Sequence, residues 1–208
     1  MKNSVLLTFM MLFGSAGIIS AQPNPPDYYT GKTRISGDGY VYNVKYLYYD
    51  DSTAFALIIQ NELNTIINTK PPQLPENLMW MTAYVTSKET ENYFMSIAAK
   101  EIKELSQEYK EERPKSQGTM FFDNDLSAMI AVNPRTGQIL EVYFSCHNTP
   151  ATKAIHPDKF YQLEQYIKQN INVPLDIFSS NLTVQNQFRE REWILTKIYF
   201  KFREMYPL

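Results

Sequence analysis

Residues 131–148 read AVNPRTGQILEVYFSCHN and predict a β-hairpin. Apolar residues alternate in the second arm, and the loop between the arms carries Pro134 and Gly137. Proline presets the backbone angle φ of a turn, and glycine permits the positive φ that closes such a loop. We therefore expect residues 126–133 and 138–146 to pair as antiparallel strands.

The same stretch carries the only cysteine, Cys146, and one of the two histidines, His147. Neighbouring side chains of a strand point to opposite faces, so His147 is badly placed to take a proton from Cys146. The other histidine, His156, stands directly before Pro157, which is typical of a helix start. We expect Cys146 to be buried as a small apolar residue, and we expect no catalytic residue, no metal ligand and no cofactor.

The N-terminal sequence MKNSVLLTFMMLFGSAGIISA, residues 1–21, has the pattern of a secretory signal peptide. Lys2 precedes an apolar run from Val5 to Phe13, and the small residue Ala21 ends the segment. This run is short for a membrane span, which needs about 20 apolar residues. We therefore expect cleavage near Ala21 and an exported protein, periplasmic or secreted, without a membrane anchor in the mature chain.

Composition predicts one folded domain in the mature protein. Removing 21 of the 208 residues leaves 187, with 19 basic against 22 acidic side chains, a net charge of −3. Because both signs are scattered, this balance gives no attraction to nucleic acid or anionic lipid. Aromatic residues make up 14% of the chain, which favours a packed globule. Residues 22–38 are rich in Pro, Gly and polar side chains and predict an extended leader, followed by a single domain over 39–208.

Hydrophobic spacing predicts further elements on both sides of the hairpin. The expected strands are 40–49, 78–85, 119–124 and 193–202, and the expected helices are 50–68, 86–113 and 157–171. Thr86 and Glu89 have the spacing of a capping box at the start of the second helix. The order β-α-β-α-β-β-β-α-β indicates an α+β fold, a mostly antiparallel sheet with about three helices packed on it.

Two stretches of the chain echo each other. GYVYNVKYL, residues 39–47, aligns with GQILEVYFS, residues 137–145, and a helix and then a strand are expected after each. The chain is therefore a candidate for a β-α-β pseudo-repeat, residues 39–85 and 137–203. Chance is the alternative, because glycine followed by alternating apolar residues is a common way to begin a strand.

The hairpin VNPRTGQILEV, the helix HPDKFYQLEQYIK and the final strand IYFKF follow one another over residues 126–203. In this order they resemble the C-terminal domain of TonB-like proteins. The signal peptide ending in Ala-Gln and the overall composition are similar to small secreted proteins of unknown function from Bacteroidetes. Likeness of fold does not carry function, so neither resemblance assigns an activity.

The remaining functional signal is tyrosine. The strand at 40–49 places Tyr42, Tyr46 and Tyr48 on one face, and aromatic side chains with a polar tip are favoured at contacts with partners. Core packing is the alternative for this face. We predict a non-enzymatic binding module that contacts a protein or glycan of the envelope or exterior through a sheet surface or edge strand, and no nucleic acid. The alternatives are a secreted hydrolase that acts on carbohydrate or peptide through acidic residues, and a structural component of an envelope assembly.

Overall fold

The computed structural model describes residues 25–49, 52–69, 84–85, 87–111, 126–174, 176 and 181–200. The strands are β1 (Arg34–Gly37), β2 (Tyr40–Tyr48), β3 (Ala54–Asn61), β4 (Tyr84–Val85), β5 (Leu126–Val132), β6 (Ile139–His147) and β7 (Ile194–Phe200). The helices are α2 (Lys88–Glu111), α3 (Pro150–Ala154), α4 (Pro157–Asn170) and α5 (Leu182–Arg189).

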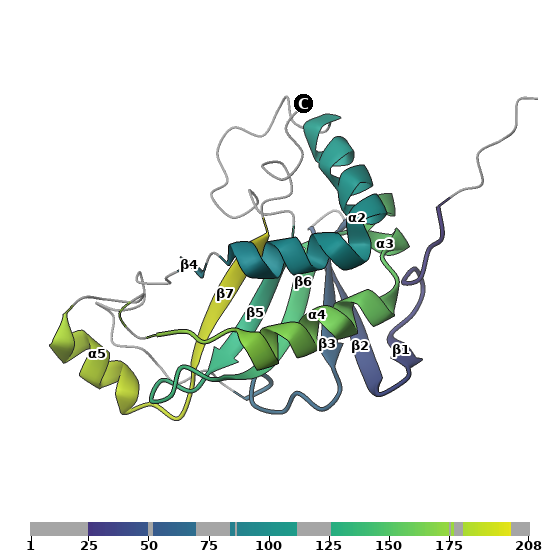
Figure 1. Ribbon diagram of the computed structural model, residues 1–208. Coiled ribbons are helices and arrows are strands. Elements are labelled where there is room, and N and C mark those ends of the chain that lie inside the picture. The colour runs from purple at the N-terminus through teal and green to yellow at the C-terminus, as the bar shows by residue number, and fades with distance from the viewer. Residues whose placement is uncertain are drawn as a thin grey trace, which may run out of the picture.

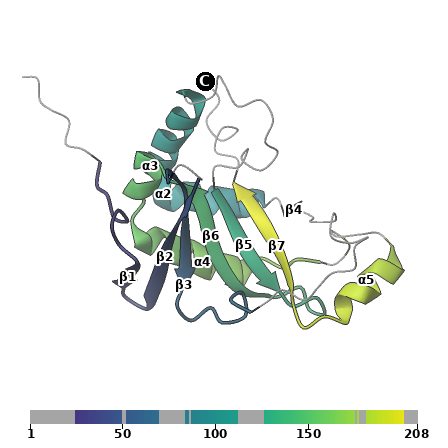
Figure 2. The same ribbon diagram turned by 180° about the vertical axis from the view of Figure 1, so that it is seen from behind.

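The strands form one sheet in the order β1-β2-β3-β6-β5-β7-β4. All neighbouring strands are antiparallel except β4 and β7, which run parallel. Helices α2 and α4 lie across one face of the sheet (Figure 1), and the opposite face is not covered by any described helix (Figure 2). The predicted α+β fold with a mostly antiparallel sheet is therefore confirmed.

The predicted hairpin forms the centre of the sheet. Strands β5 and β6 pair antiparallel, with Leu126 opposite Cys146. Gly137 has a φ of 75°, and its amide donates to the carbonyl oxygen of Asn133 at 2.8 Å. The side chain of Asn172 lies where a Cβ on Gly137 would point, so this position favours glycine for two reasons.

The predicted helix over 50–68 is wrong, because the chain forms strand β3 there. Strand β3 pairs with β2 on one side and with β6 on the other. Its central position buries apolar residues on both faces, and such a strand has no clean alternation to separate it from a helix. In the described part of residues 39–85, a strand stands where the suggested β-α-β pseudo-repeat expected its helix.

The segment predicted as an extended leader, residues 22–38, contributes to the folded domain. Strand β1 lies within it, and Tyr29 is fully buried. The Tyr29 hydroxyl donates to the carbonyl oxygen of Ile155 at 2.9 Å, which attaches the segment beside helix α3. The folded part of the chain therefore begins well before residue 39.

Two of the predicted helices are present. Helix α4 begins at Pro157, and the His156 ring nitrogen Nδ1 accepts from the amide of Asp158 at 3.3 Å. Helix α2 is present with a kink at Ala98. Its first turn is capped by Ser87, whose hydroxyl accepts from the amide of Thr90 at 3.2 Å, while the expected cap Thr86 lies outside the described residues.

Two helices were not predicted. Helix α3 is capped by Thr149, whose hydroxyl accepts from the amide of Thr152, and it carries Pro150 in its first turn. This threonine and proline pair was a readable start signal. Helix α5 replaces part of an expected polar loop, and Asn181 accepts from the amide of Thr183 at its start.

Some of the predicted segments lie partly or wholly outside the described residues. The signal peptide at 1–21 and the strand at 119–124 lie outside the described residues, and of the strand at 78–85 only Tyr84–Val85 is described. The final strand is confirmed as β7. None of the described helices combines the length and the apolar character that a membrane span requires.

The core lies between the sheet and helices α2 and α4. Phe160 on α4 stands at its centre, with its ring centroid 5.0 Å from that of Phe144, 6.1 Å from that of Phe94 and 6.3 Å from that of Tyr29. These rings come from β6, from α2 and from the N-terminal segment. One side chain therefore packs against elements that are far apart in the sequence.

Cys146 is buried on the helix-covered face, as the sequence predicts. Its thiol donates to the carbonyl oxygen of Leu57 at 3.6 Å, and burial raises its pKa. In the unfolded chain the thiol has a pKa of about 8.5. Above that pH the unfolded chain ionises the thiol, whereas the folded protein keeps it protonated. The resulting stabilisation is complete below about pH 8.5 and is lost as the pH rises towards the folded value.

We expect Cys146 to resist iodoacetamide at pH 8 in the native protein and to react fully in urea. Alkylation needs an accessible thiolate, and the folded environment provides neither access nor ionisation. The labelling rate, measured by mass spectrometry across a urea series, should rise together with the unfolding monitored by circular dichroism. Rapid labelling in the absence of urea would contradict the burial of this side chain.

Candidate functional site

The tyrosine face of β2 divides between the core and the surface. Tyr42 is 1% exposed, whereas Tyr48 is 59% exposed and Tyr46 is half-buried between them. Tyr42 is therefore a core residue, as the alternative interpretation of this face held, and its side chain does not reach the surface. Of the three tyrosines predicted as contacts, Tyr48 is exposed and Tyr46 is exposed only in part.

The Tyr42 hydroxyl belongs to a buried polar network centred on Glu164 of α4. Glu164 is 0% exposed and accepts from the Tyr42 hydroxyl at 2.8 Å, from the Asn61 side-chain amide at 3.2 Å and from the Lys168 ammonium at 2.8 Å. Burial, followed by the negative charge of Glu164, raises the pKa of Tyr42. The network joins α4 to β2 and β3, and its role is structural. In the sequence, only the four-residue spacing of Glu164 and Lys168 indicates this network.

The exposed aromatic residues gather where β2 turns into β3. We call Leu47, Tyr48, Tyr49 and Phe55 the hairpin cluster. Leu47, Tyr48 and Tyr49 are 44%, 59% and 52% exposed, and Phe55 is half-buried. The Tyr49 and Phe55 ring centroids lie 4.4 Å apart. Three consecutive large side chains are therefore presented at one end of the sheet.

A β-bulge on β3 lies beside these exposed residues. Leu47 pairs with Ala56 but Tyr48 pairs with Ala54, so Phe55 is the extra residue on β3. The extra residue breaks the alternation of side chains between the two faces of the bulged strand, β3. Ser52, with a φ of 67°, lies in the turn that follows β2. The bulge at Phe55 was not predicted, because nothing in the local sequence marks it.

The N-terminal segment packs beside helix α3. It forms a pocket of about 360 Å³ with helix α3, and the lining residues are Pro25, Pro26, Asp27, Pro150 and Lys153. The Lys153 ammonium lies 3.3 Å from the Asp27 carboxylate and donates to the Thr30 hydroxyl at 3.2 Å. Burial raises the pKa of Tyr46, and the nearby Asp27 charge adds to this shift. Asp27 of the pocket therefore lies near Tyr46, whose ring centroid is 6.4 Å from that of the cluster residue Tyr48.

The pKa of Asp27 lies well below its ordinary value. Partial burial acts to raise it, but hydrogen bonds from the side chain and amide of Thr30, the amide of Tyr29 and the ammonium of Lys153 outweigh that effect. A depressed pKa contributes stability above the unfolded value of about 4, and this contribution is lost as the pH falls.

We expect the N-terminal segment to loosen on acidification below about pH 4. Amide hydrogen exchange of Tyr29 and Thr30, compared with amides of β6 in the same samples, measures the effect. In the Asp27→Asn variant, exchange should already be fast at neutral pH and should lose this pH dependence. Equal protection of both amides at pH 3 and pH 7 in the unsubstituted protein would show that the Asp27 contacts do not fix the segment.

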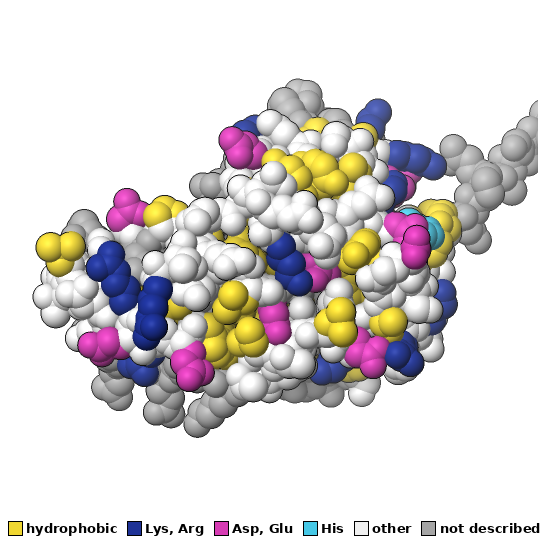
Figure 3. Space-filling view, turned by 60° about the horizontal axis from the view of Figure 1, so that its bottom comes forward, with side chains coloured by type: hydrophobic (Ala, Val, Ile, Leu, Met, Phe, Trp, Pro, Cys, Tyr) yellow, Lys and Arg dark blue, Asp and Glu magenta, His cyan; other side chains and the backbone are white. Residues whose placement is uncertain are grey.

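Acidic, basic and hydrophobic side chains are interspersed on the face shown in Figure 3. Among the described residues, no group of three or more His, Cys, Asp or Glu side chains is placed to bind a metal ion. His156 caps α4 and its ring packs edge-on against Tyr28 at 4.7 Å, whereas Cys146 bonds to Leu57. The exposed side chains of the hairpin cluster, aromatic and aliphatic, form the candidate site.

The fold is similar to that of a solved protein of unknown function. The chain resembles the crystal structure of a DUF5043 family protein from Bacteroides uniformis with a TM-score of 0.52 and 14% sequence identity, over 86% of this chain and 95% of that chain. No family model and no curated protein matches the sequence. At this identity the likeness concerns the fold alone. It agrees with the resemblance to Bacteroidetes proteins of unknown function, while the TonB resemblance stays a prediction.

Proposed function

We propose that this protein is an exported, non-enzymatic binding module that contacts a protein partner through the hairpin cluster. The observation that carries the proposal is the run Leu47-Tyr48-Tyr49, in which three consecutive large side chains are between 44% and 59% exposed. Export rests on the signal-peptide pattern of residues 1–21.

Aromatic residues are over-represented among the residues that dominate binding energy at protein interfaces. Tyrosine buries a large area while fixing few rotatable bonds, so a surface tyrosine is well suited to serve as an anchor. Leu47 and Phe55 carry no polar side-chain atoms, and their presence favours a protein surface over a carbohydrate, which needs hydrogen bonds to many hydroxyl groups. The cluster therefore suits a protein partner.

The cluster is attached to a rigid part of the fold. The backbone amide of Asn148 donates to the carbonyl oxygen of Phe55 at 3.0 Å, and its side-chain amide donates to that of Ala54, also at 3.0 Å. These bonds join the start of β3 to the end of β6. A surface that is already ordered loses little conformational entropy on binding.

The double variant Leu47→Ala/Tyr48→Ala should lose partner binding while remaining folded. Truncating an interface anchor typically costs 2 kcal/mol or more, so we expect a fall in affinity of about 30-fold or greater. The tagged wild-type chain recovers its partner from an envelope extract of the organism that encodes it, and quantitative mass spectrometry measures the recovery. Purified partner then gives the affinity.

The matched controls are Leu63→Ala and Leu182→Ala, because these leucines are 80% and 70% exposed but lie outside the cluster. Both controls should recover the same partner as the wild type. Equal recovery by the cluster variant would contradict the proposal, as would recovery of nothing specific by the wild-type chain.

A further inference from the structure

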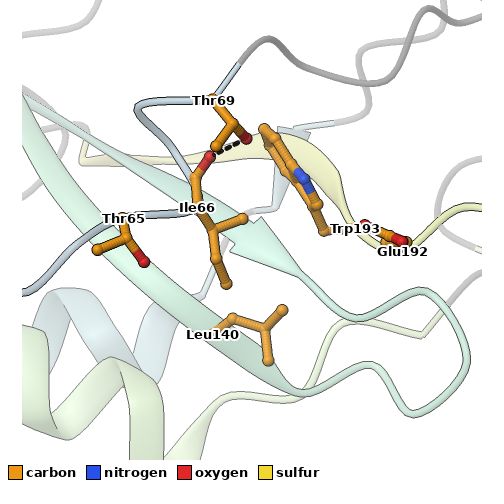
Figure 4. A pocket seen from close by; sticks show the side chains of 6 residues that line it. All are labelled: Thr65, Ile66, Thr69, Leu140, Glu192 and Trp193. Carbon is orange, nitrogen blue, oxygen red and sulfur yellow. Dashed lines mark hydrogen bonds between the residues drawn. The ribbon is translucent and has the colours of Figure 1, made fainter.

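A second pocket lies at the other end of β3, away from the hairpin cluster. It has a volume of about 290 Å³, and the lining residues are Thr65, Ile66, Thr69, Leu140, Glu192 and Trp193 (Figure 4). They come from the loop after β3, from β6 and from the residues that lead into β7. Three segments that are distant in the sequence thus meet at this pocket.

The loop wall of the pocket is fixed in place by Glu141. Its carboxylate accepts from the amides of Thr65 at 2.7 Å, Ile66 at 2.8 Å and Ile67 at 2.8 Å. The Asn64 side-chain amide donates to the carbonyl oxygen of Val142 at 2.6 Å. These four bonds join the loop to β6, so the wall does not have to become ordered when a ligand binds.

The lining combines apolar surface with hydrogen-bonding groups. Ile66 extends toward Leu140 in Figure 4, and Trp193 is only 6% exposed, which fixes its indole ring. The Glu192 carboxylate and the Thr65 hydroxyl supply polar atoms. The Thr69 hydroxyl donates to the carbonyl oxygen of Ile66 at 2.6 Å. The same hydroxyl oxygen can accept a hydrogen bond through its lone pairs.

We propose that this pocket binds one neutral sugar residue of a glycan. A sugar ring offers apolar C–H faces for the aliphatic side chains of Ile66 and Leu140, and hydroxyl groups that donate to the Glu192 carboxylate. None of the described lining residues is basic, which disfavours uronic acids and phosphorylated sugars. The volume is near the lower limit for ligand pockets, so it suits a single residue with the rest of the glycan outside.

The site is independent of the proposed protein contact, and the chain offers a direct reporter for it. Trp80 and Trp193 are the only two tryptophans, so the Trp80→Phe variant emits from Trp193 alone. We would titrate this variant with cellobiose, mannobiose and chitobiose and follow the fluorescence. At least one disaccharide should give a saturable change in emission. Calorimetry on the unsubstituted chain with the same sugars gives a second readout that needs no change at Trp80.

In the calorimetric titration, Glu192→Ala should weaken binding about tenfold or more, because a hydrogen bond to a charged group is lost. Thr65→Val should weaken it by a smaller factor. Glu190→Ala removes a neighbouring exposed carboxylate and should leave the affinity unchanged. Tyr48→Ala should also leave it unchanged, which separates this site from the hairpin cluster.

The proposal is overturned if none of the three disaccharides gives a saturable signal in either readout with folded protein. It is also overturned if Glu192→Ala binds the responding sugar as tightly as the wild type. A response to digalacturonic acid or to a lysine-rich peptide, with none to the neutral disaccharides, would assign the pocket to a different ligand class. This result would also contradict the proposal. Circular dichroism of each variant confirms that it is folded.

Discussion

Replacing Phe160 by alanine should lower the free energy of unfolding by about 3–5 kcal/mol. The side chain is fully buried, and its ring packs against Phe144, Phe94 and Tyr29. The substitution removes apolar area and leaves a cavity that rings from separate elements cannot easily fill. Urea denaturation followed by circular dichroism measures the loss.

Gln162→Ala on the same helix is the control, because Gln162 is exposed and a surface change of this kind stays within about 0.5 kcal/mol. A loss below about 1 kcal/mol for Phe160→Ala would mean that α4 does not pack on the sheet through this residue. The comparison thus tests the placement of the helix layer.

Replacing Glu164 by alanine should destabilise the protein by about 3–5 kcal/mol, because breaking one partner of a buried ion pair leaves the others uncompensated. The Tyr42 hydroxyl, the Asn61 amide and the Lys168 ammonium all lose their acceptor. Glu164→Gln keeps an acceptor oxygen and should cost less. The same urea experiment measures both variants.

The exposed ion pair between Arg34 and Glu62, at 2.6 Å, is the matched comparison. Glu62→Ala should cost no more than about 1 kcal/mol, because both side chains are well solvated. Similar losses for Glu164→Ala and Glu62→Ala would show that the Glu164 network does not contribute as a buried cluster.

The parts of the fold that could be predicted from the sequence are those with local signals. The turn at Pro134 and Gly137 marks the central hairpin, and Pro157 marks the start of α4. Strand β3 could not be predicted in this way. Its assignment depends on pairing, with Ile59 opposite Val44 on one side and Phe144 on the other. Partners so distant in the sequence override the local helical spacing.

The candidate site was predictable in part. The alternation of side chains correctly places Tyr42 and Tyr46 on one face of the strand, but it does not say which of them reaches the surface. Tyr42 is held inside by Glu164, which lies 122 residues away in the sequence. The pocket at Trp193 depends on the bonds from Glu141 to a loop 74 to 76 residues away. Such contacts exist only once the chain has folded.

Two tyrosines on one strand provide the sharpest test of the central claim that Tyr42 stabilises the fold while Tyr48 contacts the partner. The measurement is the affinity of folded Tyr42→Phe and folded Tyr48→Ala for the partner recovered by the wild-type chain. Tyr42→Phe should bind as the wild type does, and Tyr48→Ala should bind at least about 30-fold more weakly. Unchanged binding by Tyr48→Ala, or lost binding by Tyr42→Phe, would contradict it.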